Sequence, residues 1–387
     1  MLPSLLVFAD DWGRHPSSCQ HLIRHFLDRY QVIWVNTIGT RAPRLSWSTV
    51  TRGFEKLRHW SRKADDSVAL PANLRVVSPK MWPWFGSRFS RRLNLRLLSR
   101  QLTPILQELP SPAVAITTLP IVCDLIGHLP VQKWVYYCVD DFSLWPGLDQ
   151  RTLLEMDERL IRKADVIISV SENLKARIGK LGRESSLLTH GVDLEFWQLP
   201  LQDDDVQAWS TLERPLIVFW GAIDRRMDLD KVRRLAADLQ KGTIVLVGPW
   251  VDPDPALRDI PRVIHIPPLP FEQLPVLAQA ASVLIMPYAD LPVTQAIQPL
   301  KLKEYLATGR PVVVADLPAN RAWADCLDLA ASADSFSKAV FGRLATGIPE
   351  SQVKARARLA EESWTSKARL FEQALTSQEG IRNGDGR

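Results

Sequence analysis

The sequence predicts an α/β protein with two domains, each built on a parallel β-sheet. Its 387 residues are enough for two domains of ordinary size. Short apolar runs alternate with helix-like segments, which is the pattern of repeated β-α-β units. A polar stretch over 198–214 separates two such series. We therefore expect a first domain over 1–197, a linker over 198–214 and a second domain over 215–350.

The first series opens with a strand over Ser4–Ala9, a helix capped by Ser17 or Ser18 that runs to Arg29, and a strand over Gln31–Asn36. Further strands are expected over 113–117, 133–139 and 165–170, and helices over 120–127 and 151–163. Ligands of such sheets collect at the carboxyl ends of the strands. The loop after the first strand lacks G-x-G-x-x-G, so a dinucleotide cofactor is not indicated.

The second series begins at Pro215. Strands are expected over 216–221, 243–248, 263–266, 282–288 and 312–314, and helices up to about residue 240 and over 271–280, 335–346 and 351–376. The composition of the tail over 377–387, rich in Gly and charge, is typical of disorder.

The stretch over 297–315 is expected to be a short helix followed by a buried strand. Pro299 suits the first helical position, and Gly309 suits a left-handed C-terminal cap. Lys301 and Glu304 lie three residues apart, so they share one helix face near its amino end. There the cation could bind a phosphate and the carboxylate a sugar diol. The alternative is an ordinary solvated surface pair.

Composition excludes several classes of protein. Hydrophobic residues make up 46% and charged residues 24%, as in soluble globular proteins. No apolar run approaches the ~20 residues of a membrane span, and the N-terminus lacks the features of a signal peptide. The four cysteines are scattered without metal-ligand spacing, which favours free thiols in a reducing cytoplasm over a disulfide framework or a zinc site.

One block carries the excess positive charge. Residues 41–100 contain fourteen Lys or Arg and three Asp or Glu, interleaved with Trp and Phe. This composition is typical of a surface that contacts anionic lipid headgroups. Nucleic acid is the competing partner, but no known DNA or RNA module accompanies the block, so none is expected. A solvated helix with arginines over buried tryptophans is the remaining alternative.

Six motifs occur in a fixed order along the chain: Y-Y-C-V-D-D (136–141), A-D-V-I-I-S-V-S-E-N-L (164–174), T-H-G-V-D (189–193), W-G-A-I (220–223), V-L-V-G-P (245–249) and P-L-K-L-K-E-Y-L-A-T-G-R-P-V-V (299–313). The ordered set resembles the nucleotide-sugar glycosyltransferases of the B-type architecture. Within them it resembles the bacterial family 4-like group that includes teichuronic-acid and exopolysaccharide transferases. The resemblance implies two facing Rossmann-like domains, with a C-terminal helix that packs back toward the first.

The resemblance also implies a donor site in the second domain. Glu304 corresponds to the carboxylate that binds the ribose hydroxyls, and Lys301 to a pyrophosphate-contacting lysine. Arg225 or Arg226 is expected to add a phosphate contact. The rest of the expected nucleotide site consists of Gly221, Pro299 and Tyr305. The donor is expected to be UDP- or GDP-linked, with neither a metal nor another cofactor.

In the first domain, Asp140 or Asp141 is expected to act as the base that takes the acceptor's proton. The alternative is that Asp140 caps its loop. Further candidates for lining the cleft are Asp10, Asp11 and Gly13.

The donor-sugar end departs from the family pattern. Many retaining members carry a glutamate at the position of Ala296, and here only Gln295 and Gln298 offer nearby polar groups. The stereochemical outcome is therefore open.

The expected function is transfer of a sugar to a lipid-linked or polysaccharide acceptor at the cytoplasmic face of the membrane. Two alternatives remain: a nucleotide-sugar epimerase of the same fold, and a non-catalytic subunit of polysaccharide assembly.

Overall fold

The structure is a computed structural model that describes residues 3–13, 16–37, 70–145, 147–200 and 209–376. Contacts divide the chain into unit 1, Met1–Leu187 with Phe371–Arg387, and unit 2, Leu188–Leu370. Much of the basic block (41–69), the middle of the expected linker (201–208) and the expected disordered tail (377–387) lie outside the described residues.

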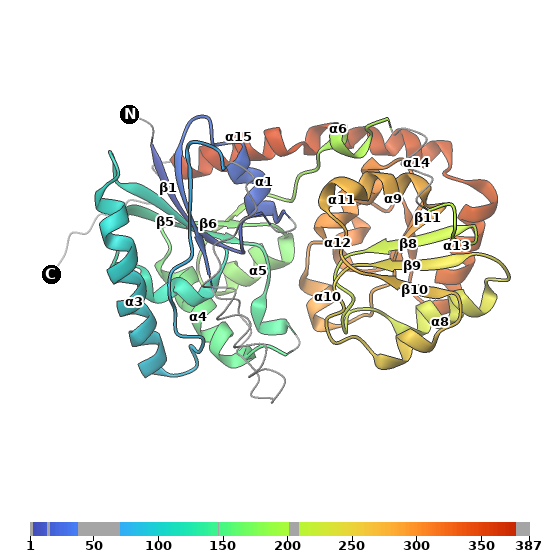
Figure 1. The fold of residues 1–387 in the computed structure, drawn as a ribbon, viewed down its shortest axis with the longest axis horizontal. Helices are drawn as coiled ribbons and strands as arrows, with labels where there is room; N and C mark the ends of the chain where they lie inside the picture. Colours follow the sequence, from blue (N-terminus) through green and yellow to red (C-terminus); the bar gives the residue numbers. More distant parts are fainter. Residues whose placement is uncertain (1–2, 14–15, 38–69, 146, 201–208, 377–387) are drawn as a thin grey trace. The chain divides into compact units, whose positions relative to one another are not determined.

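Unit 1 holds a parallel sheet that contains, in its described part, seven strands in the order β3-β2-β1-β4-β5-β6-β7 (Figure 1). The strands are β1 Ser4–Ala9, β2 Gln31–Asn36, β3 Leu74–Val77, β4 Ala113–Thr117, β5 Val131–Cys138, β6 Val166–Ser169 and β7 Ser186–Leu187. Its helices are α1 Ser18–Arg24, α3 Arg88–Gln107, α4 Gln150–Lys163 and α5 Glu172–Lys180, with the 3-10 turns η1 Pro120–Leu125 and η2 Phe142–Leu144. Strands β1 and β4 are almost wholly apolar, and residues 134–138 of β5 are buried, as expected of a parallel sheet covered on both faces.

Unit 2 repeats the plan with a six-stranded sheet, again counted over the described residues, in the order β10-β9-β8-β11-β12-β13. Its strands are β8 Leu216–Trp220, β9 Thr243–Val247, β10 Val263–Ile266, β11 Val283–Met286, β12 Val312–Ala315 and β13 Asp328–Ala330. Its helical elements before β12 are α6 Leu194–Trp197, α8 Leu229–Asp238, η3 Pro255–Asp259, η4 Phe271–Gln273, α9 Leu274–Ala280, α10 Pro292–Ala296 and α11 Leu300–Ala307. Figure 1 shows α8 on one face of this sheet and α9 and α11 on the other.

The predicted α/β class with two parallel sheets is confirmed, and some element bounds differ. The first helix ends at Arg24 rather than Arg29, because i to i−3 bonds such as that from the Phe26 amide to the Ile23 carbonyl tighten its last turn. The segment over 120–127 is a 3-10 helix, Pro120–Leu125. Pro299 is the residue just before α11 rather than its first residue.

The predicted single helix over 351–376 is wrong. After α12 Pro318–Arg321 and α13 Ala333–Thr346, the chain forms α14 Glu350–Ala355, η5 Arg356–Glu362 and α15 Trp364–Thr376. The helix is interrupted at Ser363, which has an extended backbone, bridges to Val192 and accepts a hydrogen bond from the Ser366 amide as a cap.

Helix α15 begins in unit 2 and ends in unit 1, as the family resemblance implies. Within unit 1, the Phe371 ring lies 6.1 Å from that of Phe26 and 5.3 Å from that of Tyr137. The Glu372 carboxylate accepts hydrogen bonds of 2.8 Å from Arg29 and Tyr30. None of the helices in the described ranges combines the length and the apolar character that a membrane span requires.

Candidate functional site

The expected donor residues of unit 2 meet at the carboxyl edge of its sheet, where the strand order reverses between β8 and β11. Gly221 and Gly248 directly follow β8 and β9 and have φ of +136° and +142°. A Cβ on Gly248 would lie 2.0 Å from the Gly221 carbonyl oxygen, and a Cβ on Gly221 would lie 1.9 Å from Lys301 Nζ. Only glycine therefore fits at either position, and Lys301 fills the space above Gly221.

Lys301 is half-buried at the start of α11. Its Nζ donates a 2.9 Å hydrogen bond to Tyr288 Oη and lies 4.7 Å from the centroid of the Phe219 ring. None of the carboxylates in the described ranges forms an ion pair with it. Burial alone would raise the pKa of Tyr288, but the charges of Lys301 and Arg226 outweigh it and lower that pKa. The ammonium thus keeps an unneutralised charge beside a polarised phenol.

Glu304 lies one turn further along α11 and is only 8% exposed. Burial raises the pKa of its carboxyl group to about 7, although Trp220 and Lys301 both favour the charged form. Trp220 Nε1 donates to it at 3.5 Å. Tyr305 fixes this arrangement, because its hydroxyl accepts a 2.9 Å hydrogen bond from the Trp220 amide and its ring lies 4.2 Å from the indole. Glu304 retains free acceptor positions for a ligand's hydroxyl groups.

The two arginines of the loop after β8 have different surroundings. The Arg226 guanidinium is buried, forms a 2.7 Å ion pair with Asp224 and lies 5.3 Å from the centroid of the Tyr288 ring. Arg225 is exposed and pairs with Asp252 at 3.2 Å. The structure therefore joins Arg226 to Lys301 through Tyr288 and does not bring Arg225 into this group.

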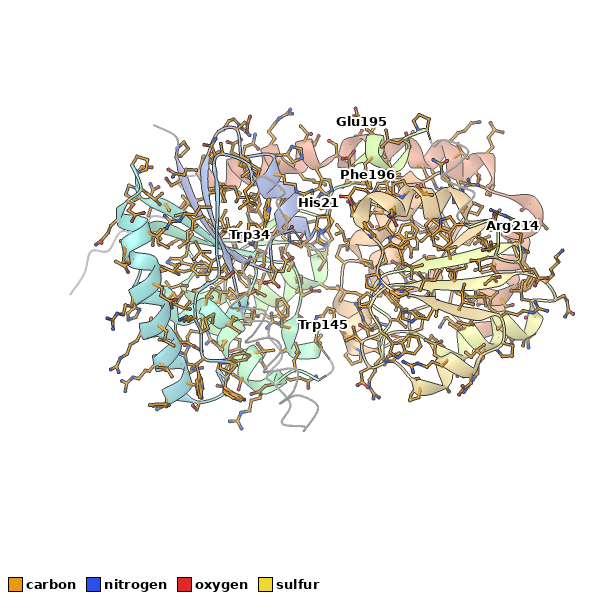
Figure 2. The ribbon with its side chains drawn as sticks, in the orientation of Figure 1. His21, Trp34, Trp145, Glu195, Phe196 and Arg214 are labelled. Atoms are coloured by element: carbon orange, nitrogen blue, oxygen red, sulfur yellow. The ribbon has the colours of Figure 1, made fainter. Side chains whose placement is uncertain are left out.

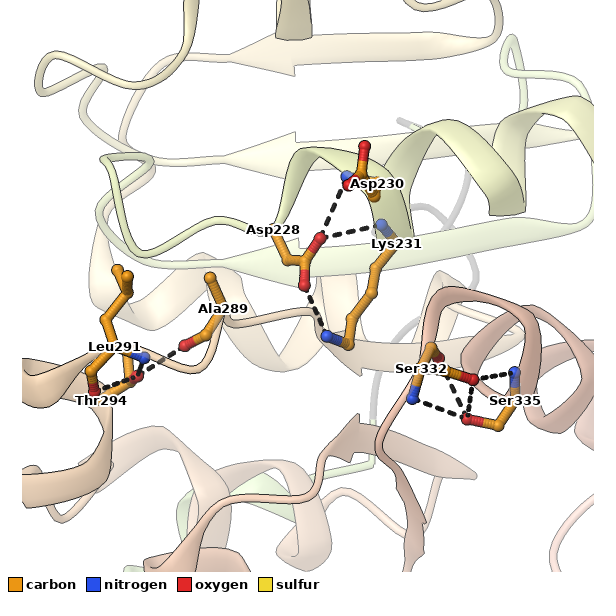
Figure 3. Close-up of polar contacts among 8 residues, drawn as sticks. All are labelled: Asp228, Asp230, Lys231, Ala289, Leu291, Thr294, Ser332 and Ser335. Atoms are coloured by element: carbon orange, nitrogen blue, oxygen red, sulfur yellow. Dashed lines mark hydrogen bonds and ion pairs between the residues drawn. The ribbon is translucent and has the colours of Figure 1, made fainter.

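Side chains that bond to backbone fix the loops at this edge (Figure 3). Asp228 accepts hydrogen bonds of 3.0 Å from the amides of Asp230 and Lys231 at the start of α8. Thr294 Oγ1 accepts from the Leu291 amide at 2.8 Å and donates to the Ala289 carbonyl. A Ser332–Ser335 capping box closes the loop after β13 in the same way.

The expected donor-sugar residues follow β11. The amide of Gln295 donates to Asp290, whereas Gln298 and Ala296 are half-buried near the end of α10. Pro299, also in the predicted set, is buried directly before α11. Lys301, Glu304, Tyr305 and Gly221 thus form one contiguous group, and the two glutamines are its neighbours along the chain.

In unit 1, Asp10, Asp11 and Gly13 form the loop after β1. Asp10 accepts hydrogen bonds of 2.8 Å from Ser17 and from Gln20, and burial raises the pKa of its carboxyl group. Gln20 also bonds to the Asp11 carbonyl at 3.1 Å and the Gly13 amide at 3.4 Å. Polar groups of Asp10, Asp11 and Gly13 therefore hold their own loop together.

Asp140 and Asp141 follow β5, as predicted, but differ in environment. Asp141 is 8% exposed, caps η2 through the Ser143 amide at 3.1 Å and pairs with Arg177 at 3.2 Å. Arg177 also pairs with the buried Asp157 at 2.6 Å. Asp140 is half-buried. Asp141 therefore has a capping role of the kind that was considered for Asp140.

Sequence reasoning missed Tyr288, Trp220 and Arg177. Tyr288 lies two residues after the apolar strand β11, and Trp220 is the last residue of the apolar strand β8, so both resemble core residues by pattern. Arg177 lies 36 residues after Asp141, and no local pattern connects the two. A general signal was available for Tyr288 and Trp220, because a polar-tipped aromatic near the carboxyl end of a strand in a parallel sheet lies at the ligand edge.

We predict that Glu304 makes the stability of the protein depend on pH. The folded protein holds the proton up to about pH 7, whereas the unfolded chain releases it near 4.5. Below pH 4.5 the carboxyl group is protonated in both states, so it does not change the free energy of unfolding with pH. Between pH 4.5 and about 7 it is protonated only in the folded protein, so the free energy of unfolding falls as pH rises. The wild-type free energy of unfolding should thus fall by about 3 kcal/mol relative to Glu304→Gln across this window. Denaturant unfolding of both proteins at a series of pH values measures the difference, and a constant difference contradicts the prediction.

No protein-family model matches the chain. It is similar in sequence to TuaH of Bacillus subtilis (strain 168), provisionally named a teichuronic acid biosynthesis glycosyltransferase. The two are 29% identical over 348 residues, which cover 82% of this chain and 81% of the relative.

Three solved structures share the fold. Sucrose-phosphate synthase from Thermosynechococcus elongatus superposes with a TM-score of 0.71 at 15% identity, covering 96% of this chain and 98% of its own. Anabaena Alr3699/HepE in complex with UDP-glucose superposes with a TM-score of 0.64 at 13% identity, covering 96% of this chain and 99% of its own. An E. coli structure described as trehalose-6-phosphate bound with UDP-2-fluoro glucose superposes with a TM-score of 0.65 at 11% identity, covering 98% of this chain and 99% of its own.

The resemblance predicted from the ordered motifs is confirmed in sequence by TuaH and in fold by these structures. The chain has the B-type glycosyltransferase fold of two Rossmann-like units and is similar in sequence to TuaH, a relative named as a glycosyltransferase.

Proposed function

We propose that the chain transfers a sugar from a nucleotide-sugar donor to a lipid-linked or polysaccharide acceptor of the cell envelope, without a metal. One observation carries this proposal. Lys301, which has no ion-pair partner among the described residues, and the buried Glu304 lie on the same helix at the point where the strand order of the second sheet reverses. The relative TuaH is named for teichuronic acid biosynthesis, and two structures of the same fold hold UDP-sugars, which supports a UDP-linked donor; GDP is the alternative.

In this proposal Glu304 accepts hydrogen bonds from the ribose hydroxyls and Lys301 binds the diphosphate. The bond from the sugar to the diphosphate breaks during transfer, so negative charge develops on the leaving nucleotide. A fixed cation that already lies in place stabilises that charge without reorganisation. Arg226 contributes through Tyr288, whose pKa the two cations lower. It positions the site rather than supplying free charge, because Asp224 neutralises it.

The donor sugar is expected beyond α10. Ala296 offers no polar group, and Gln295 already donates to Asp290, so Gln298 is the remaining candidate to hydrogen-bond the sugar. An amide binds a hydroxyl as donor or acceptor but cannot act as a nucleophile or base. We therefore propose that Gln298 selects the sugar and takes no part in the bond changes.

The acceptor hydroxyl must lose a proton as it attacks the sugar. We propose Asp140 as the group that takes it. Asp141 has the geometry of a structural residue, since a base paired with Arg177 and bonded to Ser143 would lose these contacts on protonation.

We propose that the protein works at the inner face of the cytoplasmic membrane. In the described part of the basic block, four exposed arginines recur at every fourth residue of α3, at positions 88, 92, 96 and 100. Phe89 beside them is 75% exposed. We call Arg88, Phe89, Arg92, Arg96 and Arg100 the α3 basic face. An exposed aromatic within a row of cations fits an anionic headgroup layer.

Replacement of Lys301 by Met keeps the side chain's volume beside Gly221 and removes its charge. Lys301→Met should weaken the binding of UDP roughly tenfold or more, since a charged hydrogen bond is lost, and leave uridine binding nearly unchanged. Calorimetric titration measures both. Lys338→Met, on the exposed face of α13, makes the same charge change away from the site and serves as the control. Equal UDP affinity in wild type and Lys301→Met would refute the donor site.

Removal of the proposed base should affect turnover without affecting donor binding. Asp140→Asn should lower kcat roughly a hundredfold or more with an unchanged donor KM. Asp141→Asn should mainly lower the melting temperature, because Arg177 loses a partner. Release of UDP from UDP-sugars in the presence of a membrane fraction measures turnover. Wild-type turnover by Asp140→Asn rejects this base, and a wild-type protein that binds donors but releases nothing indicates an assembly subunit.

The α3 basic face should bind anionic membranes. We expect wild-type protein to co-sediment with phosphatidylglycerol vesicles, less so as salt is added, and not with phosphatidylcholine vesicles. The triple variant Phe89→Ala, Arg96→Ala, Arg100→Ala should bind roughly tenfold more weakly. Equal binding to both vesicle types, or full binding by the triple variant, would contradict the membrane contact of this face.

A further inference from the structure

A second group of cations in unit 1 surrounds a hollow between α3, η1 and α4. This pocket, here named the α3–α4 pocket, has a volume of about 430 Å³. The charged residues that line it are Arg88, Arg91, Arg92, Arg159, Lys163 and a single carboxylate, Asp124. Right-handed crossovers place α3 and α4 on the same face of the sheet, which brings these cations together from distant parts of the chain.

Asp124 cannot neutralise this group. Arg159 pairs with it at 2.8 Å and Arg91 at 3.6 Å, so both of its oxygens are engaged. Within the described ranges no ion pair is found for Arg88, Arg92 or Lys163. Asp124 therefore holds two guanidinium groups in place, and a net positive charge remains in the pocket.

A neighbouring hollow extends the same surface. It has a volume of about 380 Å³ and shares Arg88, Arg91 and Arg159 with the first. It adds Arg151, which pairs with Glu155 at 3.4 Å. The shared arginines therefore face two adjacent spaces, an arrangement that suits a ligand with more than one anionic group.

We propose that the α3–α4 pocket binds a phosphate-bearing ligand, a diphosphate or a phosphate ester. The planar guanidinium matches two phosphate oxygens at once, and several cations gathered with one carboxylate repel one another unless an anion joins them. The volume lies within the range of small-molecule sites, which is more than a lone phosphate needs. The ligand is either a soluble phosphorylated compound or the headgroup of a lipid.

This site is separate from the proposed donor site, since all its residues belong to unit 1 and the donor candidates belong to unit 2. It is also distinct from most of the α3 basic face, because Arg96 and Arg100 do not line it. The proposal therefore stands or falls independently of the nucleotide-sugar assignment.

The test is calorimetric titration with inorganic pyrophosphate, carried out on full-length protein in a Lys301→Met background so that the proposed donor site does not contribute. Binding should be roughly tenfold weaker in the double variant Arg159→Ala, Lys163→Ala. The matched control, Arg96→Ala with Arg100→Ala, removes the same number of charges and should bind as the background does. The single variant Lys163→Ala changes an exposed residue with no ion pair in the described ranges, so it should fold normally and lose less pyrophosphate affinity than the double variant. It keeps the test valid if the loss of Arg159 impairs folding.

A second arm identifies the source of the phosphate. The same variants are sedimented with vesicles of phosphatidylcholine and phosphatidic acid in equal parts. Loss of vesicle binding in the pocket variants beyond that in the control supports a lipid headgroup, and loss of pyrophosphate binding alone supports a soluble ligand. The proposal is overturned if the background protein binds neither probe, or if pocket and control variants bind both equally.

Discussion

The close approach of the backbones at Gly221 and Gly248 is the constraint on which the proposed donor site of unit 2 depends. The ends of β8 and β9 lie too close together there for any side chain, and the space above Gly221 belongs to Lys301. The Tyr305 hydroxyl then ties α11 to the backbone of Trp220, its 2.9 Å bond leaving little freedom for the helix to shift. Lys301 and Glu304 are thus positioned by the sheet itself rather than by a mobile loop.

Two lysines of α11 show how burial and pairing distinguish a structural role from the proposed binding role. Lys303 is 3% exposed and bonds to Glu362 and the His190 carbonyl, and burial lowers its pKa to about 8. Lys301, two residues earlier, points to the opposite side and is paired with a phenol instead of a carboxylate. The charge of Lys303 is balanced by its carboxylate partner, so it attracts an anionic ligand only weakly. Of these two lysines, Lys301 is therefore the one whose charge can bind an anion.

The sequence predicted the strands best, because buried parallel strands are continuous apolar runs; the expected bounds of β1, β2 and β4 agree with the structure to the residue. It also placed Lys301 and Glu304, since helix spacing is local. It could not foresee the break at Ser363, which follows from pairing with Val192 some 170 positions earlier in the chain. The Asp141–Arg177–Asp157 network has the same origin, because partners joined only by the fold leave no periodic signal.

The two units differ in what their polar groups are free to do. In unit 1 the carboxylates of Asp10 and Asp141 hold loops, through Ser17 and Gln20 in one case and Arg177 in the other. Cations without an ion-pair partner in the described part of that unit, such as Arg92 and Lys163, lie on α3 and α4. The proposed anion site and the proposed base therefore belong to different elements of unit 1, because the cations come from α3 and α4 whereas Asp140 follows β5. An acceptor with an anionic part could gain affinity from these cations while its hydroxyl group is bound elsewhere.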